Sequence, residues 1–322
     1  MNITHSLVSI VIPVYNRTHL IRDALDSAWQ QTHRPLEVVV VDDGSTDNTV
    51  NVVKEWIATH QGDPAFSCHI HTQENKRAPA ARNRGIRESR GEYIQFLDSD
   101  DKLYSETIAQ KLEAIDNSGL PYAYCPNHIT DANGNIVGKC GSPWPPNGDG
   151  AIATYLFHTS GPLIPRHAFD QIGYWDEGLV ATDEIELFAR LKLHIGQGAF
   201  VQEYGLAQRD HSGNRVSRAG GIGPDPSAYI VIKKIFGLVK GTHYDNSVER
   251  NAIARFGCGA VEAYALSGEF TLASKSLEFS HKVANGKKRI QLWLLLGAKR
   301  LMAAEQFYKL FVYLRSRQRR EL

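Results

Sequence analysis

The stretch "GEYIQFLDSDDKLY" (residues 91–104) places three carboxylates directly after a run that is typical of a buried strand. The apolar segment "YIQFL" ends there, and Asp98, Asp100 and Asp101 follow within four positions. Crowded carboxylates repel one another, and removing them from water is unfavourable unless a positive charge compensates. The stretch therefore predicts either a solvated acidic turn or a cation site at the end of a strand.

Two earlier segments also have the composition of buried strands. "LVSIVIPVY" (7–15) and "LEVVVVDDGS" (36–45) are almost unbroken β-branched runs, as in strands that are covered on both faces. Segments with helical periodicity alternate with the strands, at about residues 18–31, 45–57 and 78–91. This alternation predicts an α/β fold with a mostly parallel mixed sheet and helices on both faces.

The second of these strands ends in Asp42 and Asp43, so the predicted sheet has two acidic strand ends. In open α/β sheets, ligands bind beyond the carboxyl ends of the strands. A single acidic strand end is often simply solvated. Two that face the same crevice favour a ligand site.

The pattern changes after about residue 121. "YAYCPNHITDANGNIVGKC" (122–140) predicts two strands joined by a turn at Asn133–Gly134. From about residue 224 the sequence is helical. Residues 287–322 contain ten Lys and Arg and two Glu, a net charge of +8, so residues 1–286 must carry −7 to give the total of +1.

Composition narrows the class of protein. The mildly acidic body argues against a nucleic-acid partner. Four widely spaced cysteines form no CxxC pair and indicate free thiols in a reducing compartment, and Cys68 with its neighbouring histidines is expected to lie on a strand rather than to bind metal. The sequence shows no signal-peptide pattern and no apolar stretch of the ~18–20 residues that span a bilayer. We therefore expect a cytoplasmic protein.

Five segments resemble, in order, the successive motifs of glycosyltransferase family 2 over roughly residues 6–218. They are "VSIVIPVYNR", "VVVVDDGSTDNT", "AARNRGI…RGEYIQFLDSDD", "GYWDEGL" and "DEIELFARL". The resemblance implies a GT-A domain at residues 1–222, with a nucleotide-binding half at about 1–102 and an acceptor half at about 103–222. Residues 223–322 are expected to form a helical C-terminal extension with a basic tail.

The resemblance also implies an activity. That activity is transfer of a hexosyl or N-acetylhexosaminyl group, with inversion at the anomeric carbon, from a nucleoside-diphosphate sugar that we expect to be UDP-linked. The implied acceptor is a saccharide or a lipid-linked glycan. The implied process is the synthesis of bacterial surface polysaccharide in the cell envelope.

The acidic strand end matches the family's DxD motif, which binds Mn²⁺ or Mg²⁺ together with the donor. Such cations prefer carboxylate oxygens and substrate phosphates, and they neutralise charge that develops on a diphosphate leaving group. The resemblance implies Asp100 and Asp101 as metal ligands, with Asp98 in support. His211, in "RDHSGNRVS" (209–217), is a further candidate ligand, the alternative being a surface-loop histidine.

Other positions match the family's donor site. Asp43 aligns with the aspartate that accepts a hydrogen bond from the imide N–H of uracil in relatives, although its neighbour Asp42 is an open alternative that could instead orient the turn. Arg82, on the helix before the acidic strand, suits phosphate or base contacts. The expected nucleotide-binding residues are Pro13, Tyr15, Asn16, Asp43, Arg82, Asp98 and Asp100.

An inverting transfer needs a general base that takes the proton of the acceptor hydroxyl. In the family this base is an aspartate, commonly in an "ED" pair before a helix that reads "LWLRL". Here "LFARL" matches, and counting back from Arg190 puts Glu184 at the base position and Asp183 at its partner, with the order reversed. The alternative is that both carboxylates only complement the dipole of a helix N-terminus.

Other classes are weaker alternatives. A phosphohydrolase with an aspartyl nucleophile also has a strand-end DxD that binds Mg²⁺, but it requires Thr or Val where this chain has Lys102. A non-catalytic sugar-nucleotide-binding protein would bind the donor without turnover. No GxGxxG follows the early strands, which argues against a dinucleotide oxidoreductase. The basic tail predicts packing against the body or a second subunit, or docking on anionic lipid.

Overall fold

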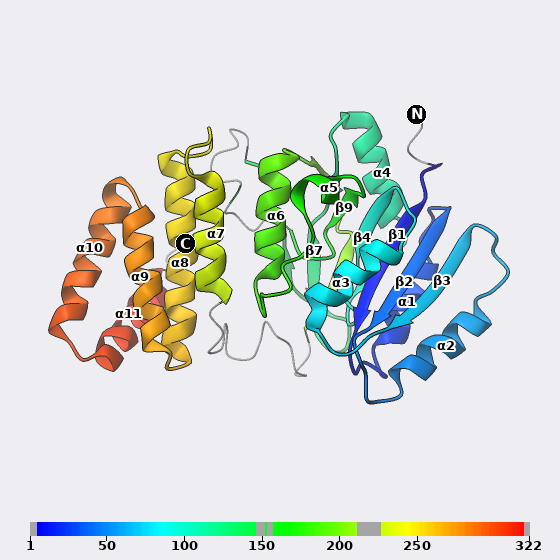
Figure 1. Ribbon diagram of the computed structural model, residues 1–322, viewed down its shortest axis with the longest axis horizontal. Coiled ribbons are helices and arrows are strands. Elements are labelled where there is room, and N and C mark those ends of the chain that lie inside the picture. Colours follow the sequence, from blue (N-terminus) through cyan, green and yellow to red (C-terminus); the bar gives the residue numbers. More distant parts are fainter. Residues whose placement is uncertain (1–4, 146–151, 153–156, 211–226, 319–322) are drawn as a thin grey trace. The chain divides into compact units, whose positions relative to one another are not determined.

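The computed structural model describes residues 5–145, 152, 157–210 and 227–318. The chain divides into two compact units, and Figure 1 shows their secondary structure. Unit 1 comprises Met1–Trp144, Tyr155–Glu177 and His194–Ser212, and unit 2 comprises Pro145–Thr154, Gly178–Leu193 and Gly213–Leu322.

Unit 1 contains a seven-stranded sheet. Its strands are β1 (Val8–Val14), β2 (Leu36–Asp42), β3 (Phe66–Thr72), β4 (Tyr93–Phe96), β6 (Ala123–Tyr124), β9 (Pro162–Pro165) and β10 (Ala199–Phe200). They are ordered β10-β6-β9-β4-β1-β2-β3. Only β9 runs antiparallel to its neighbours, β4 and β6. The predicted mostly parallel mixed sheet is therefore confirmed.

The strand order of the sheet reverses at β1. β2 lies on one side of β1 and β4 on the other, both parallel to it. The carboxyl ends of β1, β2 and β4 therefore open onto the same edge, where α/β sheets of this kind bind ligands. The loops that follow these strands carry five of the predicted donor residues, Tyr15, Asn16, Asp43, Asp98 and Asp100, whereas Pro13 lies in β1 and Arg82 in α3 (Arg77–Glu88).

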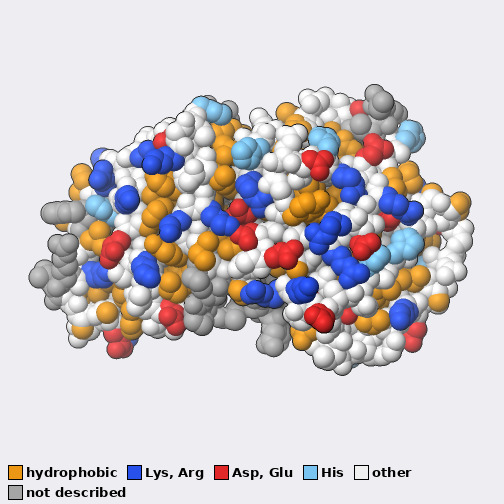
Figure 2. All heavy atoms as spheres, viewed as in Figure 1, with side chains coloured by type: hydrophobic (Ala, Val, Ile, Leu, Met, Phe, Trp, Pro, Cys, Tyr) orange, Lys and Arg blue, Asp and Glu red, His pale blue; other side chains and the backbone are white. Residues whose placement is uncertain are grey.

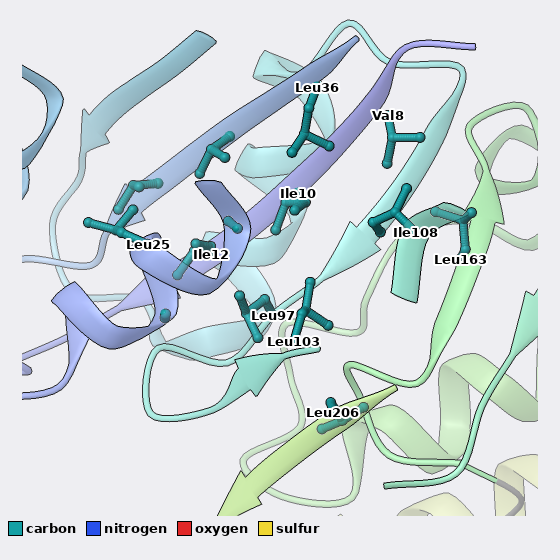
Figure 3. Packing of buried hydrophobic residues seen from close by; sticks show 14 of the residues in the cluster. Val8, Ile10, Ile12, Leu25, Leu36, Leu97, Leu103, Ile108, Leu163 and Leu206 are labelled. Atoms are coloured by element: carbon teal, nitrogen blue, oxygen red, sulfur yellow. The ribbon is translucent and has the colours of Figure 1, made fainter. Parts of the chain in front are cut away.

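Helices cover both faces of the sheet. They are α1 (Ile21–Trp29), α2 (Thr49–Thr59), α3 (Arg77–Glu88), α4 (Thr107–Ser118) and α5 (Ala168–Ile172). Figure 3 shows Ile10 and Ile12 of β1 beside Leu25 of α1, within a core cluster that also contains side chains of α2 and α4. Alternate residues of a strand point to opposite faces, and Val39 and Val41 of β2 accordingly pack with Ala81 of α3 on the other side.

A second sheet in unit 1 contains the predicted hairpin. Its four strands are β5 (Lys102–Leu103), β11 (Leu206–Arg209), β7 (Asn127–Thr130) and β8 (Ile136–Cys140), in that order. β7 and β8 pair in antiparallel fashion, and Gly134 takes the positive φ of 86° in the turn between them. β5 begins directly after Asp101, so this sheet continues from the acidic strand end.

Unit 2 is helical, as its sequence predicts. Its helices are α6 (Asp183–His194), α7 (Ser227–Val239), α8 (Ser247–Leu266), α9 (Phe270–Val283), α10 (Gly286–Leu301) and α11 (Ala304–Gln318). Phe307, Tyr308 and Phe311 of α11 are buried in one apolar cluster with side chains of α8 and α9. Within the described ranges, no helix is both long enough and apolar enough to cross a bilayer.

Candidate active site

The loops after β1 and β2 are locked together by Asn16. This residue has a positive φ of 51°, a conformation that asparagine tolerates better than most residues. Its backbone N–H donates to Ser45 Oγ at 2.9 Å, and its side-chain Oδ1 accepts from the backbone N–H of Thr46 at 2.8 Å. Asn16 therefore shapes the predicted nucleotide site through the backbone of both loops.

The neighbours of Asn16 occupy different environments. Pro13 is buried inside β1, where it pairs with Val41, so its ring contributes to the sheet interior. Tyr15 follows the strand and is 44% exposed. The Tyr15 side chain is therefore exposed just beyond the strand end, whereas Pro13 lies within the strand.

Asp42 and Asp43 have different hydrogen-bond partners. The Asp42 Oδ2 atom accepts from the backbone N–H of Ser45 at 3.1 Å and so holds the turn. The Asp43 Oδ1 atom accepts from Gln73 Nε2 at 2.8 Å and from the backbone N–H of Lys76 at 2.9 Å. Both carboxylates are almost fully buried. Turn orientation is therefore the observed role of Asp42, and Asp43 joins the end of β2 to the segment before α3.

Arg82 connects α3 to the acidic strand end. Its Nη2 atom donates to Asp98 Oδ1 at 2.8 Å, and its guanidinium lies 4.5 Å from the centre of the Trp175 ring. Asn83 secures the Trp175 segment through both amide atoms, with the backbone N–H of Trp175 donating to Oδ1 at 2.8 Å and Nδ2 donating to the Trp175 carbonyl at 2.9 Å. This buried arginine is therefore held in one orientation beside the strand end.

Asp101 closes the turn that follows β4. Its backbone N–H donates to the Asp98 carbonyl at 3.0 Å, and its Oδ1 atom accepts from the backbone N–H of Arg209 on β11 at 3.0 Å. The carboxylate is 1% exposed, whereas Asp100 lies half-buried between the two. The Arg209 side chain pairs with Asp23, whose pKa is lowered because hydrogen bonds from Arg209 and Lys102 outweigh the opposing effect of burial.

The structure brings a histidine to these carboxylates that the sequence did not suggest. His158 Nε2 lies 3.9 Å from Asp98 Oδ2, and His158 Nδ1 lies 3.8 Å from Asp101 Oδ2. One ligand atom from each of the three residues lies within 4.8 Å of the other two. Asp100 takes no part in this cluster, and His211 lies outside the described residues.

The donor set of this cluster fits a divalent cation. Two ligands bound to one ion at ~2.1 Å are at most about 4.2 Å apart, so the side chains need only small rotations to share an ion. Two carboxylates and an imidazole are oxygen and nitrogen donors of the kind that first-row divalent metals accept. His158 stands 57 positions after Asp101 in a stretch without clear periodicity, so no spacing signal in the sequence pointed to it.

The predicted general bases lie in unit 2. Asp183 and Glu184 are the first two residues of α6, and Thr182 before them has a positive φ of 60°. A β-branched residue in this region is strained, and such strain concentrates at functional turns. Glu186, also in the first turn, pairs with Arg190 at 2.6 Å. Helix α6 therefore begins with the carboxylates of Asp183 and Glu184 directly after a strained residue.

Sequence comparisons identify relatives of the chain. A family model described as "Glycosyl transferase family 2" matches residues 9–148. An uncharacterised glycosyltransferase from Rickettsia prowazekii (strain Madrid E) is 32% identical over 228 residues, which are 68% of this chain and 68% of that protein. Chondroitin synthase from Escherichia coli is 37% identical over 140 residues, 43% of this chain but 20% of that longer protein.

Solved structures match the architecture over almost the whole chain. The structure of S. aureus TarS residues 1–349 in complex with UDP-GlcNAc has a TM-score of 0.74 at 18% identity, covering 97% of this chain and 92% of that one. At this identity the likeness concerns the fold, which is GT-A. The Rickettsia relative and the order of the five motifs along the chain indicate the family. The chain belongs to glycosyltransferase family 2.

Proposed function

We propose that this glycosyltransferase is an inverting, metal-dependent enzyme that takes its sugar from a UDP-sugar. The observation that carries the proposal is the convergence of Asp98, Asp101 and Arg82 at the carboxyl end of β4. These groups combine cation ligands with a preorganised guanidinium at the edge where α/β sheets bind ligands. The sugar is a hexosyl or N-acetylhexosaminyl group.

Each donor-site residue has a defined task in this proposal. Asp98 and Asp101 would hold a divalent cation, which would neutralise charge on the diphosphate leaving group, and Asp100 beside them hydrogen-bonds the ribose. Arg82 binds a phosphate oxygen. Asp43 accepts the imide N–H of uracil, and Tyr15 stacks on the base while Asn16 holds the loop.

The acceptor half of the reaction needs a base. Glu184 takes the proton of the attacking acceptor hydroxyl, and Asp183 is the alternative at the same helix N-terminus. The hydroxyl oxygen bonds to the anomeric carbon from the face opposite the leaving diphosphate, which inverts the configuration. We assign the acceptor to saccharides or lipid-linked glycans of bacterial surface polysaccharide, made on the cytoplasmic side.

Calorimetric titration of UDP, GDP and UMP with Mn²⁺, Mg²⁺ or EDTA tests the donor site. We expect metal-dependent UDP binding by the wild type and its loss in Asp101→Ala. GDP should bind more weakly than UDP. If no nucleotide binds under any of these conditions, the proposed donor site is wrong.

Substitution of the two candidate bases separates their roles. Glu184→Gln should lower kcat by about 10²–10⁴ while UDP affinity stays within a factor of two, because general-base catalysis contributes on that order. Asp183→Asn serves as the matched neighbour. A larger loss in Asp183→Asn would assign the base to Asp183, and full activity in both variants would exclude this helix as its source.

The proposed function includes contact of residues 287–322 with an anionic membrane surface. Ile290 and Leu294 lie on one side of α10 at 61% and 58% exposure, within residues 287–322, which carry a net charge of +8. Figure 2 shows apolar side chains at the surface beside Lys and Arg side chains on the part formed by the C-terminal helices. Exposed apolar residues flanked by cations are typical of helices that lie on anionic lipid.

Vesicle co-sedimentation tests this contact. The wild type should sediment with phosphatidylcholine vesicles that contain phosphatidylglycerol and much less with phosphatidylcholine alone. Ile290→Ser/Leu294→Ser should weaken binding, whereas the equally exposed pair Ile136→Ser/Val137→Ser on β8 should not. Loss of self-association in light scattering by the α10 variant, without a change in vesicle binding, would assign the face to a second copy instead.

A further inference from the structure

We infer that His158 is a protein ligand of the donor-site cation and that the buried side chain of Gln95 positions the turn that carries it. The inference rests on the proposed function, because it concerns the same cation. It adds a ligand that lies outside the acidic motif. It also predicts which divalent ion the site prefers.

The turn that carries His158 is attached to the acidic strand end. The backbone N–H of Asp98 donates to Ser160 Oγ at 3.2 Å. The backbone N–H of Gly161 donates to the His158 carbonyl at 2.7 Å and closes the turn before β9. A side chain at Gly161 would meet that carbonyl oxygen at 2.9 Å, so the tight turn requires glycine. His158 therefore approaches Asp98 and Asp101 on a backbone that is bonded to the same strand end.

Gln95, in β4, supports this turn from inside the protein. Its Nε2 atom donates to the Ser160 carbonyl and to the Phe96 carbonyl, each at 2.7 Å. Its Oε1 atom accepts from Lys111 Nζ of α4, also at 2.7 Å. Gln95, Lys111 and Ser160 are all fully buried. The amide thus ties β4, α4 and the His158 turn together at one point.

Burying these polar groups lowers the stability of the fold relative to an apolar core. β4 is a central strand, and an apolar residue at position 95 could be buried there without needing the hydrogen-bond partners that glutamine requires. Burial also lowers the pKa of Lys111, against the opposing effect of the nearby Cys125 thiol. Buried hydrogen bonds between side chains hold their partners in one geometry. Residues that orient metal ligands typically change metal affinity by 10–100-fold when they are replaced.

The donor set has a consequence for ion preference. Mg²⁺ strongly prefers oxygen ligands and retains water, whereas Mn²⁺ lies higher in the affinity order for nitrogen donors. An imidazole beside two carboxylates therefore selects Mn²⁺ over Mg²⁺. Removing the imidazole should reduce Mn²⁺ affinity more than Mg²⁺ affinity.

Pulsed electron paramagnetic resonance of Mn²⁺ bound to the full chain with UDP tests the ligand directly. A coordinated imidazole gives a ¹⁴N coupling, which we expect in the wild type and in His211→Ala but not in His158→Ala. We expect His158→Ala to raise the Kd for Mn²⁺ at least tenfold and to change the Kd for Mg²⁺ less. A ¹⁴N coupling that survives in His158→Ala, or its absence from the wild type with bound Mn²⁺, would overturn the inference.

A second comparison tests the positioning role of Gln95. Lys111→Met keeps both Gln95 donors and should leave Mn²⁺ affinity near that of the wild type. Lys111→Met/Gln95→Leu removes the donors together with the buried charge and should weaken Mn²⁺ binding by 10–100-fold. Equal Mn²⁺ affinity in the two variants would limit Gln95 to a structural role. A wild type that binds UDP without any metal would instead reject the metal requirement of the proposed function itself.

Discussion

Arg82 and Asp98 form an ion pair whose Nη2···Oδ1 distance is 2.8 Å, and their side chains are only 9% and 23% exposed. The same guanidinium lies 4.5 Å from the centre of the Trp175 ring. A lysine could supply the charge at this position but not the planar group that stacks on the indole. The geometry therefore distinguishes Arg82 from the other arginines of α3.

We expect Arg82→Lys to weaken UDP binding about tenfold, because the stacked guanidinium is lost while the charge remains. Calorimetric titration with UDP and Mn²⁺ measures the change. Arg87→Lys is the matched control, since Arg87 lies on the same helix, is exposed and lies over Tyr174 at 5.9 Å. Equal effects of the two substitutions would contradict a specific role for Arg82.

Asp43→Asn should reduce the preference for UDP over GDP about tenfold. The asparagine Oδ1 atom can still accept from Gln73 and from the backbone of Lys76, so the loop is kept while the charged acceptor for an imide N–H is lost. Competition binding with both nucleotides measures the preference. Asp42→Asn is the control, and a larger change there would transfer the base contact to Asp42.

Gly85→Ala should destabilise the protein by about 1–3 kcal/mol, although alanine alone favours a helix by ~1 kcal/mol over glycine. An added Cβ on Gly85 would overlap the Val11 side chain where α3 packs on β1. Gly237→Ala on α7 is the control. Its added Cβ would meet nothing within 4 Å, so this substitution should stabilise the protein. Urea unfolding of both variants gives the comparison, and stabilisation by Gly85→Ala would show that the strand yields.

Lys192 should make stability depend on pH. It is 2% exposed on α6, and burial lowers its pKa to about 7, against the opposing charge of Glu249. Between pH 7 and the ordinary lysine pKa of 10.5, the unfolded chain binds more protons than the folded chain, so stability rises with pH in this window.

The reference variant for this pH effect replaces both buried partners, Lys192→Met with Glu249→Gln, so that neither charge is left alone. Above pH 7, the unfolding free energy of the wild type should rise relative to that of this variant by up to ~1.4 kcal/mol per pH unit. Below pH 7, the curves of unfolding free energy against pH should be parallel for the two proteins. Urea unfolding from pH 6 to 10 measures the difference. Parallel curves over the whole range would show that Lys192 titrates normally.

Much of unit 1 was predictable because its signals are local. The buried strands β1, β2 and β4 are continuous apolar runs, and the β7–β8 hairpin is marked by Asn133–Gly134. The acidic residues that end β2 and β4 stand next to those runs in the sequence. The family resemblance, which the comparisons confirm, depends on the same contiguous motifs.

The sequence by itself determined the order of the motifs along the chain, the family and the three carboxylates Asp98, Asp100 and Asp101 after β4. Only the tertiary structure decided that His158 joins Asp98 and Asp101 while Asp100 takes no part in their cluster. His158 reaches them because β9 inserts antiparallel between β4 and β6, a long-range pairing that brings its preceding turn to the β4 end. Local periodicity carries no information about such a pairing, in which the buried Gln95 side chain bonds to the Ser160 carbonyl 65 positions away.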